Sequence, residues 1–281
     1  MIYFLTINYY STNLVTQLIN SIQSDIKYTL IIINNSPNDD SIGLLKSASI
    51  ILLEPGINLG FGKGCNFGLN WIYKHDKQAI VWIINPDAYL LPDSLPKLNL
   101  FFNTYPELSI VGTIVYTPTG KIWFAGGSFI PSSGAILNID ILTNSETAYI
   151  PCDWVSGCSL LINLGNFCEC PQFDPAYFLY YEDFDFCRRY ASLGHLIAVT
   201  KHLGVIHQHG AITNRNMFKK MQYSTFSYLL TLEKYTNSLV LLVRLTRLIA
   251  YALLLILVKP TVAFGKLYGV LLYLRRSRFT W

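Results

Sequence analysis

The chain has 281 residues, of which 52% are apolar. This length and composition exclude a protein that is too small or too polar to bury a large core. The net charge of +4 combines two regions of opposite sign. Residues 1–185 contain 7 Lys/Arg and 16 Asp/Glu (net −9), and residues 186–281 contain 14 Lys/Arg and 1 Asp/Glu (net +13). No recognised nucleic-acid-binding motif accompanies the basic part, so we expect no nucleic-acid partner.

The first part of the chain alternates strand and helix patterns. Strands are expected at 2–7, 28–33, 50–53 and 79–84, and helices at 13–22 and 61–73. Continuous apolar strands separated by helices are typical of a parallel sheet that is covered on both faces. Residues 110–163 are richer in short strands and turns, and a further helix is expected at 182–193, where Gly194 ends it.

The pattern changes from about Met217. The stretch 239–258 is almost wholly apolar, but Arg244 and Arg247 interrupt it, and its longest uncharged run, 248–258, has 11 residues. A membrane-spanning helix needs about 20 apolar residues. We therefore expect helices that lie on the membrane surface rather than a span, with ordinary helices packed on the domain as the alternative.

The cysteines and the N-terminus bear on the compartment. The six cysteines show no CxxC spacing and no Cys/His pattern, so a structural zinc site is not expected. The chain enters a strand directly, without the basic segment and cleavage site of a signal peptide. We expect a cytoplasmic protein with reduced thiols.

Candidate chemistry lies in acidic residues near apolar segments. Aromatic residues surround the cluster of Glu182, Asp183 and Asp185, which a water-facing acidic run would not carry. We expect these carboxylates to be half-buried, where a charge is costly unless it is paired, hydrogen-bonded or used in chemistry. Asp87 follows the strand expected at 79–84, and ligands of open α/β sheets collect at the carboxyl ends of strands. These acids are therefore candidates for holding a metal and removing a proton.

A glycine-rich segment precedes and begins the helix expected at 61–73. It reads Asn58-Leu-Gly60-Phe61-Gly62-Lys63-Gly64-Cys-Asn66. It is neither a P-loop nor a GxGxxG fingerprint. Its glycines permit either a close approach to a ligand or tight helix packing, and the spacing alone leaves both open.

Eight short motifs follow one another along the chain in a characteristic order. They are Thr6-Ile-Asn8-Tyr9, Asn34-Asn35-Ser36-Pro37, Asn58-x-Gly60-Phe61, Asn85-Pro86-Asp87, Asp153-Trp154-Val-Ser-Gly157, Phe173-Asp174, Tyr181-Glu182-Asp183 and His207. Over roughly residues 2–212 the chain resembles the inverting, nucleotide-sugar-dependent glycosyltransferases of family 2, especially the rhamnosyltransferase-like and galactofuranosyltransferase-like branch. The resemblance implies an α/β fold of the GT-A type, a mostly parallel open sheet with helices on both faces. We expect this catalytic domain at 1–212 and a basic, apolar helical region at 213–281.

The resemblance also implies a divalent metal site. Asn85-Pro86-Asp87 resembles the family's Asp-x-Asp motif, with Asn85 in place of the first acid. Asp87 would bind Mn²⁺ or Mg²⁺, which bridges the diphosphate of the sugar donor. His207 resembles a second ligand, with His209 as its competitor, and imidazole suits Mn²⁺ better than Mg²⁺.

Asp183 corresponds in this resemblance to the family's catalytic base. Such a base takes the proton of the acceptor hydroxyl while the nucleoside diphosphate leaves from the opposite face of the sugar. Glu182 would orient the acceptor or the base, or else it is a first-turn acid favoured by the helix dipole. We expect Asp185 to be structural. Trp154 lies where the family often has an aromatic residue near the sugar, and a buried core tryptophan is the alternative.

The same resemblance implies a binding site for the sugar nucleotide. Asn8 and Asn34 would line the nucleobase and ribose pocket, but the family commonly has Asp where Asn34 stands, so the base preference is open between uracil and thymine. The residues expected to bind the nucleotide sugar are Asn8, Asn34, Asn58, Gly60, Phe61, Asn66, Asn85 and Trp154.

The expected function is that of a metal-dependent inverting glycosyltransferase. It would move a rhamnosyl or other hexosyl group from a UDP- or dTDP-sugar to a hydroxyl of a glycan or lipid-linked glycan in cell-surface polysaccharide synthesis. We expect it on the inner face of the cell membrane, where basic residues favour anionic lipid. One alternative is a catalytically inactive nucleotide-binding or scaffold protein, which the joint presence of Asp87, Asp183 and His207 disfavours. Another is a nucleotidylyltransferase, but no Lys/Arg-rich triphosphate loop occurs near the N-terminus.

Overall fold

Parallel strands at the N-terminal end of the chain form one half of a large sheet. The computed structural model describes residues 1–140 and 146–276. Strand β1 (Ile2–Asn8) runs parallel to β2 (Tyr28–Asn34) on one side and to β4 (Ile80–Ile84) on the other, and β3 (Ile50–Leu53) continues the sheet beyond β2. All residues of β1 are buried, as expected for an apolar strand covered on both faces.

The other half of the sheet is mixed. Strand β11 (Ser159–Asn163) runs antiparallel between β4 and β6 (Leu108–Tyr116), and β12 (Leu196–His207) runs parallel to β6. The strand order is β10-β12-β6-β11-β4-β1-β2-β3. Shorter strands complete the fold: β5 (Ala88–Leu90), β7 (Ile122–Phe124), β10 (Tyr149–Pro151) and the separate hairpin of β8 (Gly127–Ile130) and β9 (Ala135–Asn138). The expected mostly parallel open sheet is confirmed, with β11 as an antiparallel strand inside it and with β5, β7 and β10 also paired antiparallel.

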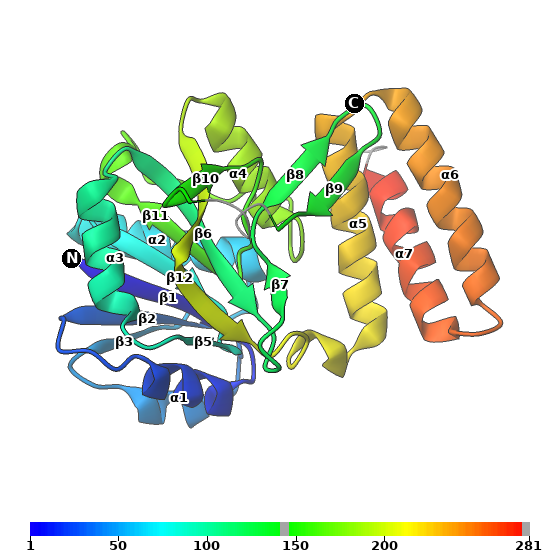
Figure 1. Ribbon diagram of the computed structural model, residues 1–281. Helices are drawn as coiled ribbons and strands as arrows, with labels where there is room; N and C mark the ends of the chain where they lie inside the picture. Colours follow the sequence, from blue (N-terminus) through cyan, green and yellow to red (C-terminus); the bar gives the residue numbers. More distant parts are fainter. Residues whose placement is uncertain (141–145, 277–281) are drawn as a thin grey trace.

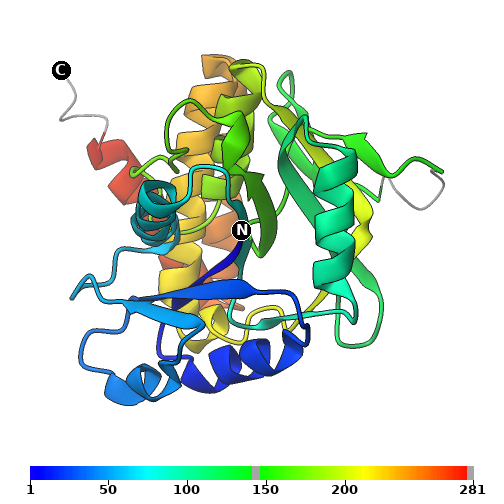
Figure 2. The same cartoon turned by 90° about the vertical axis from the view of Figure 1, so that its left-hand side faces the viewer.

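Helices cover the sheet on both sides (Figure 1, Figure 2). They are α1 (Thr12–Ser21), α2 (Phe61–His75), α3 (Ser94–Thr104) and α4 (Glu182–Ser192), with short 3-10 turns η1 (Asp40–Leu45), η2 (Leu164–Asn166) and η3 (Thr213–Arg215). Glycines let α2 approach the sheet closely: a Cβ atom on Gly68 would lie 2.3 Å from Leu5 of β1. The helices expected at 13–22, 61–73 and 182–193 form, and each begins and ends within two residues of its expected bounds.

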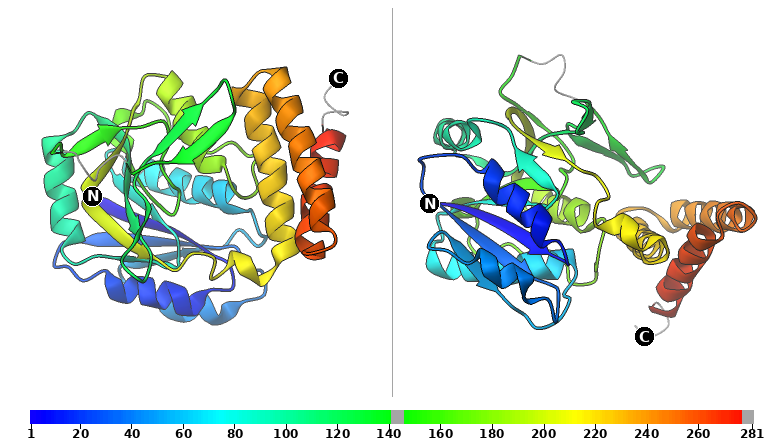
Figure 3. Two further views of the ribbon diagram at one scale, coloured as in Figure 1. Left: turned by 45° about the vertical axis from the view of Figure 1, so that its right-hand side comes forward. Right: turned by 90° about the horizontal axis from the view of Figure 1, so that it is seen from below.

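Three further helices form the C-terminal part: α5 (Met217–Tyr235), α6 (Ser238–Leu255) and α7 (Pro260–Arg276). Helix α5 lies next to the part that contains the large sheet, and α6 and α7 lie outside α5 (Figure 3). Helix α7 meets α5 at small residues, since a Cβ atom on Gly265 would lie 2.6 Å from the carbonyl oxygen of Phe218. Helix α6 contacts the β8–β9 hairpin, where Arg244 Nε donates to the carbonyl of Ser133 at 2.8 Å. The division expected between residues 212 and 213 stays a prediction.

Among the described residues, α6 is the one helix that is long and apolar enough to cross a membrane. Only 6% of its 18 residues are buried in the structure. We call the exposed apolar side chains of α6, of residues 256–259 and of α7 the outer apolar face. The most exposed members of this face are Leu239 (70%), Leu254 (75%), Leu257 (92%) and Val258 (74%).

Candidate active site

Two chain segments bring Asp87 and His207 together. Asp87 follows β4 in a tight turn, closed by a hydrogen bond from the backbone N–H of Ala88 to the carbonyl of Asn85 at 3.0 Å. Strand β5 then pairs antiparallel with β12, so Ala88 lies opposite His207. His207 Nε2 lies 3.1 Å from Asp87 Oδ1, and both side chains are buried. A carboxylate and an imidazole that are 120 positions apart in sequence thus form one pair.

The donor atoms of this pair fit part of a cation site. His207 Nε2 and Asp87 Oδ1 lie 3.1 Å apart, which is close enough for both atoms to bind one cation. No group of three His, Cys, Asp or Glu side chains that could hold a metal occurs in the described part of the chain. Cations of the Mg²⁺ type use only one or two carboxylates and complete their shell with water and phosphate oxygens. The two side chains therefore fit a cation that takes its remaining ligands from a bound diphosphate.

His209, the competing ligand, lies beside His207, and Trp123 contacts both rings. Its ring centroid is 5.8 Å from that of His207, and the Trp123 ring lies 5.1 Å from His209 and 5.3 Å from His207. Partial burial lowers the pKa of His209, which favours the neutral imidazole. The geometry brings His207, rather than His209, against Asp87.

Asp183 projects from the first turn of α4 and is held by backbone N–H groups. Its Oδ2 accepts from Gly157 N at 2.8 Å, and its Oδ1 accepts from Phe184 N at 2.8 Å. Burial raises the pKa of Asp183, although these two hydrogen bonds act in the opposite direction. A carboxylate in a fixed orientation with a raised pKa has the properties of a general base.

Glu182 is more deeply buried than its neighbour. It is 5% exposed and lies against Gly62 of α2, and its Oε2 has no hydrogen-bond partner among the described residues. Burial, and then the nearby charge of Asp183, raise the pKa of Glu182. The charge of Asp183 therefore disfavours ionisation of Glu182.

The backbone before α4 has an uncommon conformation. Tyr180 and Tyr181 both have positive φ angles, 71° and 65°. Non-glycine residues rarely adopt this region, and such strain persists only where the surrounding structure fixes it. The two left-handed residues turn the chain so that the first turn of α4 presents Asp183 to Gly157.

Cys158 lies between the Asp87–His207 pair and the acidic cluster of α4. Its carbonyl accepts from Asn85 N at 3.0 Å, just before Asp87, and it follows Gly157, whose N–H binds Asp183. Burial raises the pKa of its thiol, and the nearby carboxylates of Asp87 and Asp183 raise it further. The two acidic centres therefore flank the same short segment at the end of β4 and the start of β11.

The amides of Asn8 and Asn34 bind each other at the ends of β1 and β2. Asn8 Nδ2 donates to Asn34 Oδ1 at 3.2 Å, and Asn8 Oδ1 accepts from the backbone N–H of Ser11 at 3.0 Å. Asn34 Oδ1 also accepts from Ser36 N at 3.1 Å. These contacts shape the loops of the expected nucleotide pocket, and direct contact of either amide with a nucleotide stays a prediction.

A cavity of about 420 Å³ opens beside these asparagines. Arg215, in η3 after the end of β12, reaches it and donates to the carbonyl of Tyr10 at 2.7 Å. Sequence reasoning missed Arg215 and Asp39, because a lone arginine in a polar loop and an acid in a turn carry no periodic signal. The lining residues are Tyr10, Ser11, Thr12, Asn13, Leu14, Asn38, Asp39, Ser41 and Arg215.

The glycine-rich segment packs against the chain before α4. Asn58 Oδ1 accepts from Gly60 N at 2.9 Å, and a Cβ atom on Gly60 would lie 2.3 Å from the carbonyl oxygen of Phe178. Asn66 exchanges two hydrogen bonds with the backbone of Phe173, at 2.8 and 2.7 Å. Of the two possibilities left open by the sequence, the structure shows tight packing, whereas nucleotide binding by these residues stays a prediction.

Aromatic residues line the remainder of the site. Phe61, at the start of α2, and Asp183 both lie next to Gly157, since a Cβ atom on Gly157 would be 3.1 Å from Phe61 and 3.2 Å from Asp183. Trp154 is half-buried against Phe124, with ring centroids 5.0 Å apart, and its Nε1 has no hydrogen-bond partner among the described residues. Unpartnered buried polar atoms thus occur at Trp154, Glu182 and His207, which all belong to the expected site.

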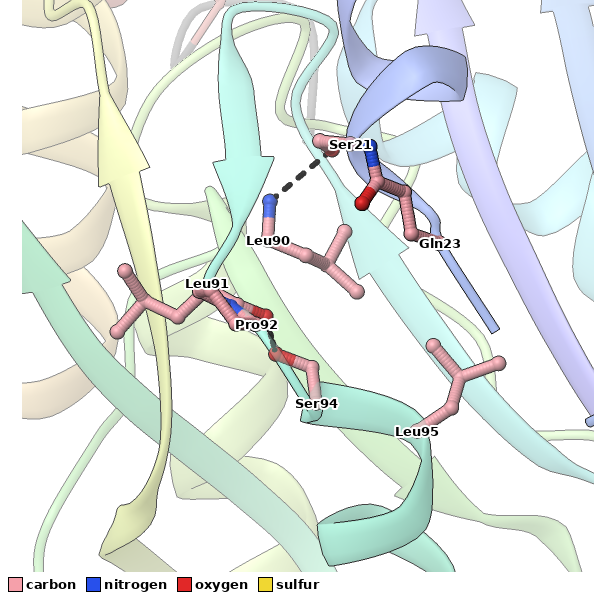
Figure 4. A pocket seen from close by; sticks show the side chains of 7 residues that line it. All are labelled: Ser21, Gln23, Leu90, Leu91, Pro92, Ser94 and Leu95. Atoms are coloured by element: carbon pink, nitrogen blue, oxygen red, sulfur yellow. Dashed lines mark hydrogen bonds between the residues drawn. The ribbon is translucent and has the colours of Figure 1, made fainter. Parts of the chain in front are cut away.

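A second cavity, of about 200 Å³, lies away from these residues (Figure 4). It is formed where the end of α1 meets β5 and the start of α3, and Leu90 N donates to Ser21 Oγ at 3.1 Å in its wall. None of the expected site residues lines it. We assign it no part in the chemistry.

The mostly parallel mixed sheet with helices on both faces is of the GT-A type. Residues 5–161, more than half of the chain, match the family model described as glycosyl transferase family 2. The chain therefore belongs to glycosyl transferase family 2, which confirms the expected family and the expected class of fold.

Two curated relatives carry rhamnosyltransferase names. The N-acetylglucosaminyl-diphospho-decaprenol L-rhamnosyltransferase of Mycobacterium tuberculosis is 26% identical over 192 residues, which cover 60% of this chain and 62% of that protein. The chain thus spans less than two thirds of the length of this relative. Rhamnosyltransferase WbbL of Escherichia coli is 24% identical over 249 residues, which cover 82% of this chain and 92% of that protein.

Solved structures share the fold at low sequence identity. GalNAc-T7, solved with UDP, GalNAc and Mn²⁺, has a TM-score of 0.58 at 11% identity and covers 83% of this chain and 47% of its own. The mannosyltransferase PcManGT of Pyrobaculum calidifontis, solved with GDP-Man and Mn²⁺, has a TM-score of 0.55 at 11% identity and covers 97% of this chain and 86% of its own.

Proposed function

We propose that this protein transfers a sugar, with inversion, from a UDP- or dTDP-sugar to a hydroxyl of a glycan or lipid-linked glycan in cell-surface polysaccharide synthesis. The observation that carries the proposal is the placement of two acidic centres on either side of Cys158. One centre is the Asp87–His207 pair, and the other is Asp183, which backbone N–H groups orient. The rhamnosyltransferase names of the relatives make a rhamnosyl group the first candidate for the transferred sugar.

Asp183 acts as the general base in this proposal. Its carboxylate accepts the proton of the acceptor hydroxyl as the hydroxyl oxygen bonds to the anomeric carbon. The bond from that carbon to the diphosphate breaks on the opposite face, and the electron pair leaves with the nucleoside diphosphate. The hydrogen bonds from Gly157 and Phe184 fix the direction of the carboxylate, and the raised pKa strengthens it as a base.

Asp87 and His207 would hold a divalent cation, Mn²⁺ or Mg²⁺. Such a cation, when bound, stabilises negative charge on a leaving diphosphate. The closeness of His207 Nε2 and Asp87 Oδ1, 3.1 Å apart and both buried, is the feature of this chain that suits it. Two structural neighbours were solved with Mn²⁺, which supports a divalent cation in this proposal.

The proposal includes a peripheral position on the inner face of the cell membrane. The outer apolar face exposes large aliphatic side chains, and residues 234–276 contain no Asp or Glu but several Lys and Arg. An apolar surface with basic residues suits an anionic membrane, on which a lipid-linked acceptor would be reached directly. The mycobacterial relative is named for a decaprenol-linked substrate, which supports an acceptor of that class.

Product analysis tests the proposal. The purified full-length chain is incubated with Mn²⁺, a panel of UDP- and dTDP-sugars including dTDP-rhamnose, and polyprenyl-diphosphate-linked N-acetylglucosamine. We expect one sugar donor to give a glycosylated lipid product of inverted anomeric configuration. Absence of product and of nucleotide release with every member of the panel contradicts the proposal. The family match and the named relatives do not favour the inactive-scaffold or nucleotidylyltransferase alternative.

A further inference from the structure

Helix α5 holds the strained segment that leads into α4. Ser227 Oγ donates to the carbonyl of Leu179 at 2.9 Å, directly before the left-handed pair Tyr180 and Tyr181. Ring contacts lie on either side: the centroids of Phe178 and Tyr223 are 4.6 Å apart, and those of Tyr181 and Tyr228 are 5.6 Å apart. The upstream end of the turn is thus fixed by side chains of α5.

The downstream end is fixed through Asp185, the third acid of the cluster. Asp185 is fully buried, and its Oδ1 accepts from Lys234 Nζ and from Tyr235 Oη, each at 2.9 Å. Its Oδ2 accepts from Arg189 Nε at 2.6 Å, and Lys234 also contacts Asp174. A buried carboxylate is tolerated only where such partners compensate it, so its position follows theirs.

We infer that α5 positions the Asp183 carboxylate for catalysis, with Ser227, Lys234 and Tyr235 as positioning residues. The inference rests on the proposed function, in which Asp183 is the general base. The strained pair and Asp183 lie between the two points at which α5 holds the chain, Leu179 and Asp185. None of the three positioning side chains contacts Asp183 itself, so each acts through the backbone of this turn.

Loss of the contacts between α5 and this turn should change the activity in a specific way. A base works only within hydrogen-bond reach of its proton, and a misplacement of about 1 Å can cost about 10²-fold in rate. The N–H groups of Gly157 and Phe184 stabilise the charged carboxylate of Asp183. If the turn relaxes and these contacts lengthen, the pKa of Asp183 rises, and the acid limb of the rate profile moves to higher pH.

The test uses the full-length chain with three single variants, Ser227→Ala, Tyr235→Phe and Lys234→Met. Tyr149→Phe is the matched loss of a tyrosine hydroxyl that donates to a carboxylate, here Glu107 Oε1 at 3.2 Å and away from this turn, and Glu233→Gln alters α5 on the side that faces Arg276. We expect at least about tenfold lower kcat for Tyr235→Phe and Ser227→Ala. Binding of the nucleoside diphosphate should stay within about twofold of wild type, and the acid limb should move to higher pH. The two control variants should behave as wild type.

The outcomes separate this inference from the proposed function. Circular dichroism and thermal unfolding identify a variant that does not fold. If Lys234→Met does not fold, Tyr235→Phe still tests the inference, because it removes only one oxygen atom. If wild type transfers sugar, Asp183→Asn does not, and folded Tyr235→Phe and Ser227→Ala keep the wild-type kcat and pH profile, the positioning role is refuted while the function stands. If wild type transfers no sugar, or Asp183→Asn transfers it normally, the proposed function fails and this inference fails with it.

Discussion

Asp183 is the residue on which the proposed reaction depends most directly. Replacement by Asn keeps the size of the side chain but removes its ability to accept a proton. We expect the transfer rate of Asp183→Asn to fall about 10²- to 10⁴-fold, while calorimetry shows nearly unchanged affinity for the nucleoside diphosphate. Asp93→Asn, at the start of α3, is the control and should keep full activity. A folded Asp183→Asn protein that keeps more than half of the wild-type turnover would rule out the assignment.

The Asp87–His207 pair predicts a metal-dependent affinity for the diphosphate. Asp87→Ala should weaken nucleoside-diphosphate binding in the presence of Mn²⁺ and make the remaining binding insensitive to EDTA. His207→Ala should have the same effect to a smaller extent, because a neutral ligand contributes less than a carboxylate to a hard cation. Isothermal titration with and without EDTA measures both. An equal response to EDTA in wild type and Asp87→Ala contradicts the site.

Glu182 should cost stability at neutral pH. Its folded-state pKa lies well above the ordinary value of 4.5, because burial and Asp183 disfavour the charged form. The folded state therefore binds more protons than the unfolded chain between these two pKa values, and the free energy of unfolding falls as the pH rises through that window. Glu182→Gln removes this dependence, so its stability relative to wild type should increase from pH 4 to pH 7. Denaturant unfolding measures it, with the exposed Glu54→Gln as control. A constant difference across this range would be evidence against the raised pKa.

At the scale of elements, the helices and the central strands were predictable, because apolar residues recur along the sequence with the spacing that each type of element buries. The strands around β1 are continuous apolar runs, and the helices α1, α2 and α4 were expected nearly to the residue. Strand β12 was missed because two exposed residues, Lys201 and His202, interrupt its apolar pattern at an irregularity in its pairing with β6. Without β12, the sequence could suggest His207 by resemblance but could not bring it against Asp87.

The candidate site was predictable in its acids and less so in its amides. A carboxylate in an aromatic or apolar segment stands out because burial makes it costly. An asparagine at a strand end does not reveal its partner, and Asn8 and Asn34 bind each other, while Asn66 binds the backbone of Phe173. Their partners lie 26 and 107 positions away, so only the folded chain shows them.

Alanine substitutions at Gly60 and Gly56 test how tightly the glycine-rich segment packs against the chain before α4. Gly60 and Gly56 have similar positive φ angles, 78° and 76°, but a Cβ atom would meet the carbonyl oxygen of Phe178 only at Gly60, whereas Gly56 has nothing within 4 Å. Gly56→Ala should cost about 1–2 kcal/mol for the left-handed backbone. Gly60→Ala should cost clearly more and lower activity, because its ψ of −173° at positive φ is open almost only to glycine and because Phe178 must move. Chemical denaturation of both variants gives the difference, and equal costs would mean that the loop yields without strain.

The whole molecule combines an acidic catalytic part with a basic C-terminal part whose outer apolar face is exposed. Each basic residue near an anionic membrane contributes about 1 kcal/mol, and salt screens this contribution. Burial of apolar side chains in the interface adds a contribution that salt does not remove. We therefore expect the full-length protein to float with anionic vesicles at low salt, to bind zwitterionic vesicles much less, and to keep part of its binding at high salt.

A charge on the outer apolar face should weaken that binding. Leu257 is 92% exposed after α6, and Leu257→Glu places an anion where the acyl boundary is expected. Leu44→Glu is the matched control, because Leu44 is 88% exposed on η1, outside the C-terminal helices. Flotation on phosphatidylserine vesicles should show a loss for Leu257→Glu and none for Leu44→Glu, with activity on a water-soluble acceptor unchanged in both. Wild-type protein that stays unbound at low salt contradicts membrane docking. If Leu257→Glu instead converts a dimer to a monomer in sedimentation without altering flotation, the face joins two copies of the chain, because a contact between copies needs the same exposed leucines but no lipid.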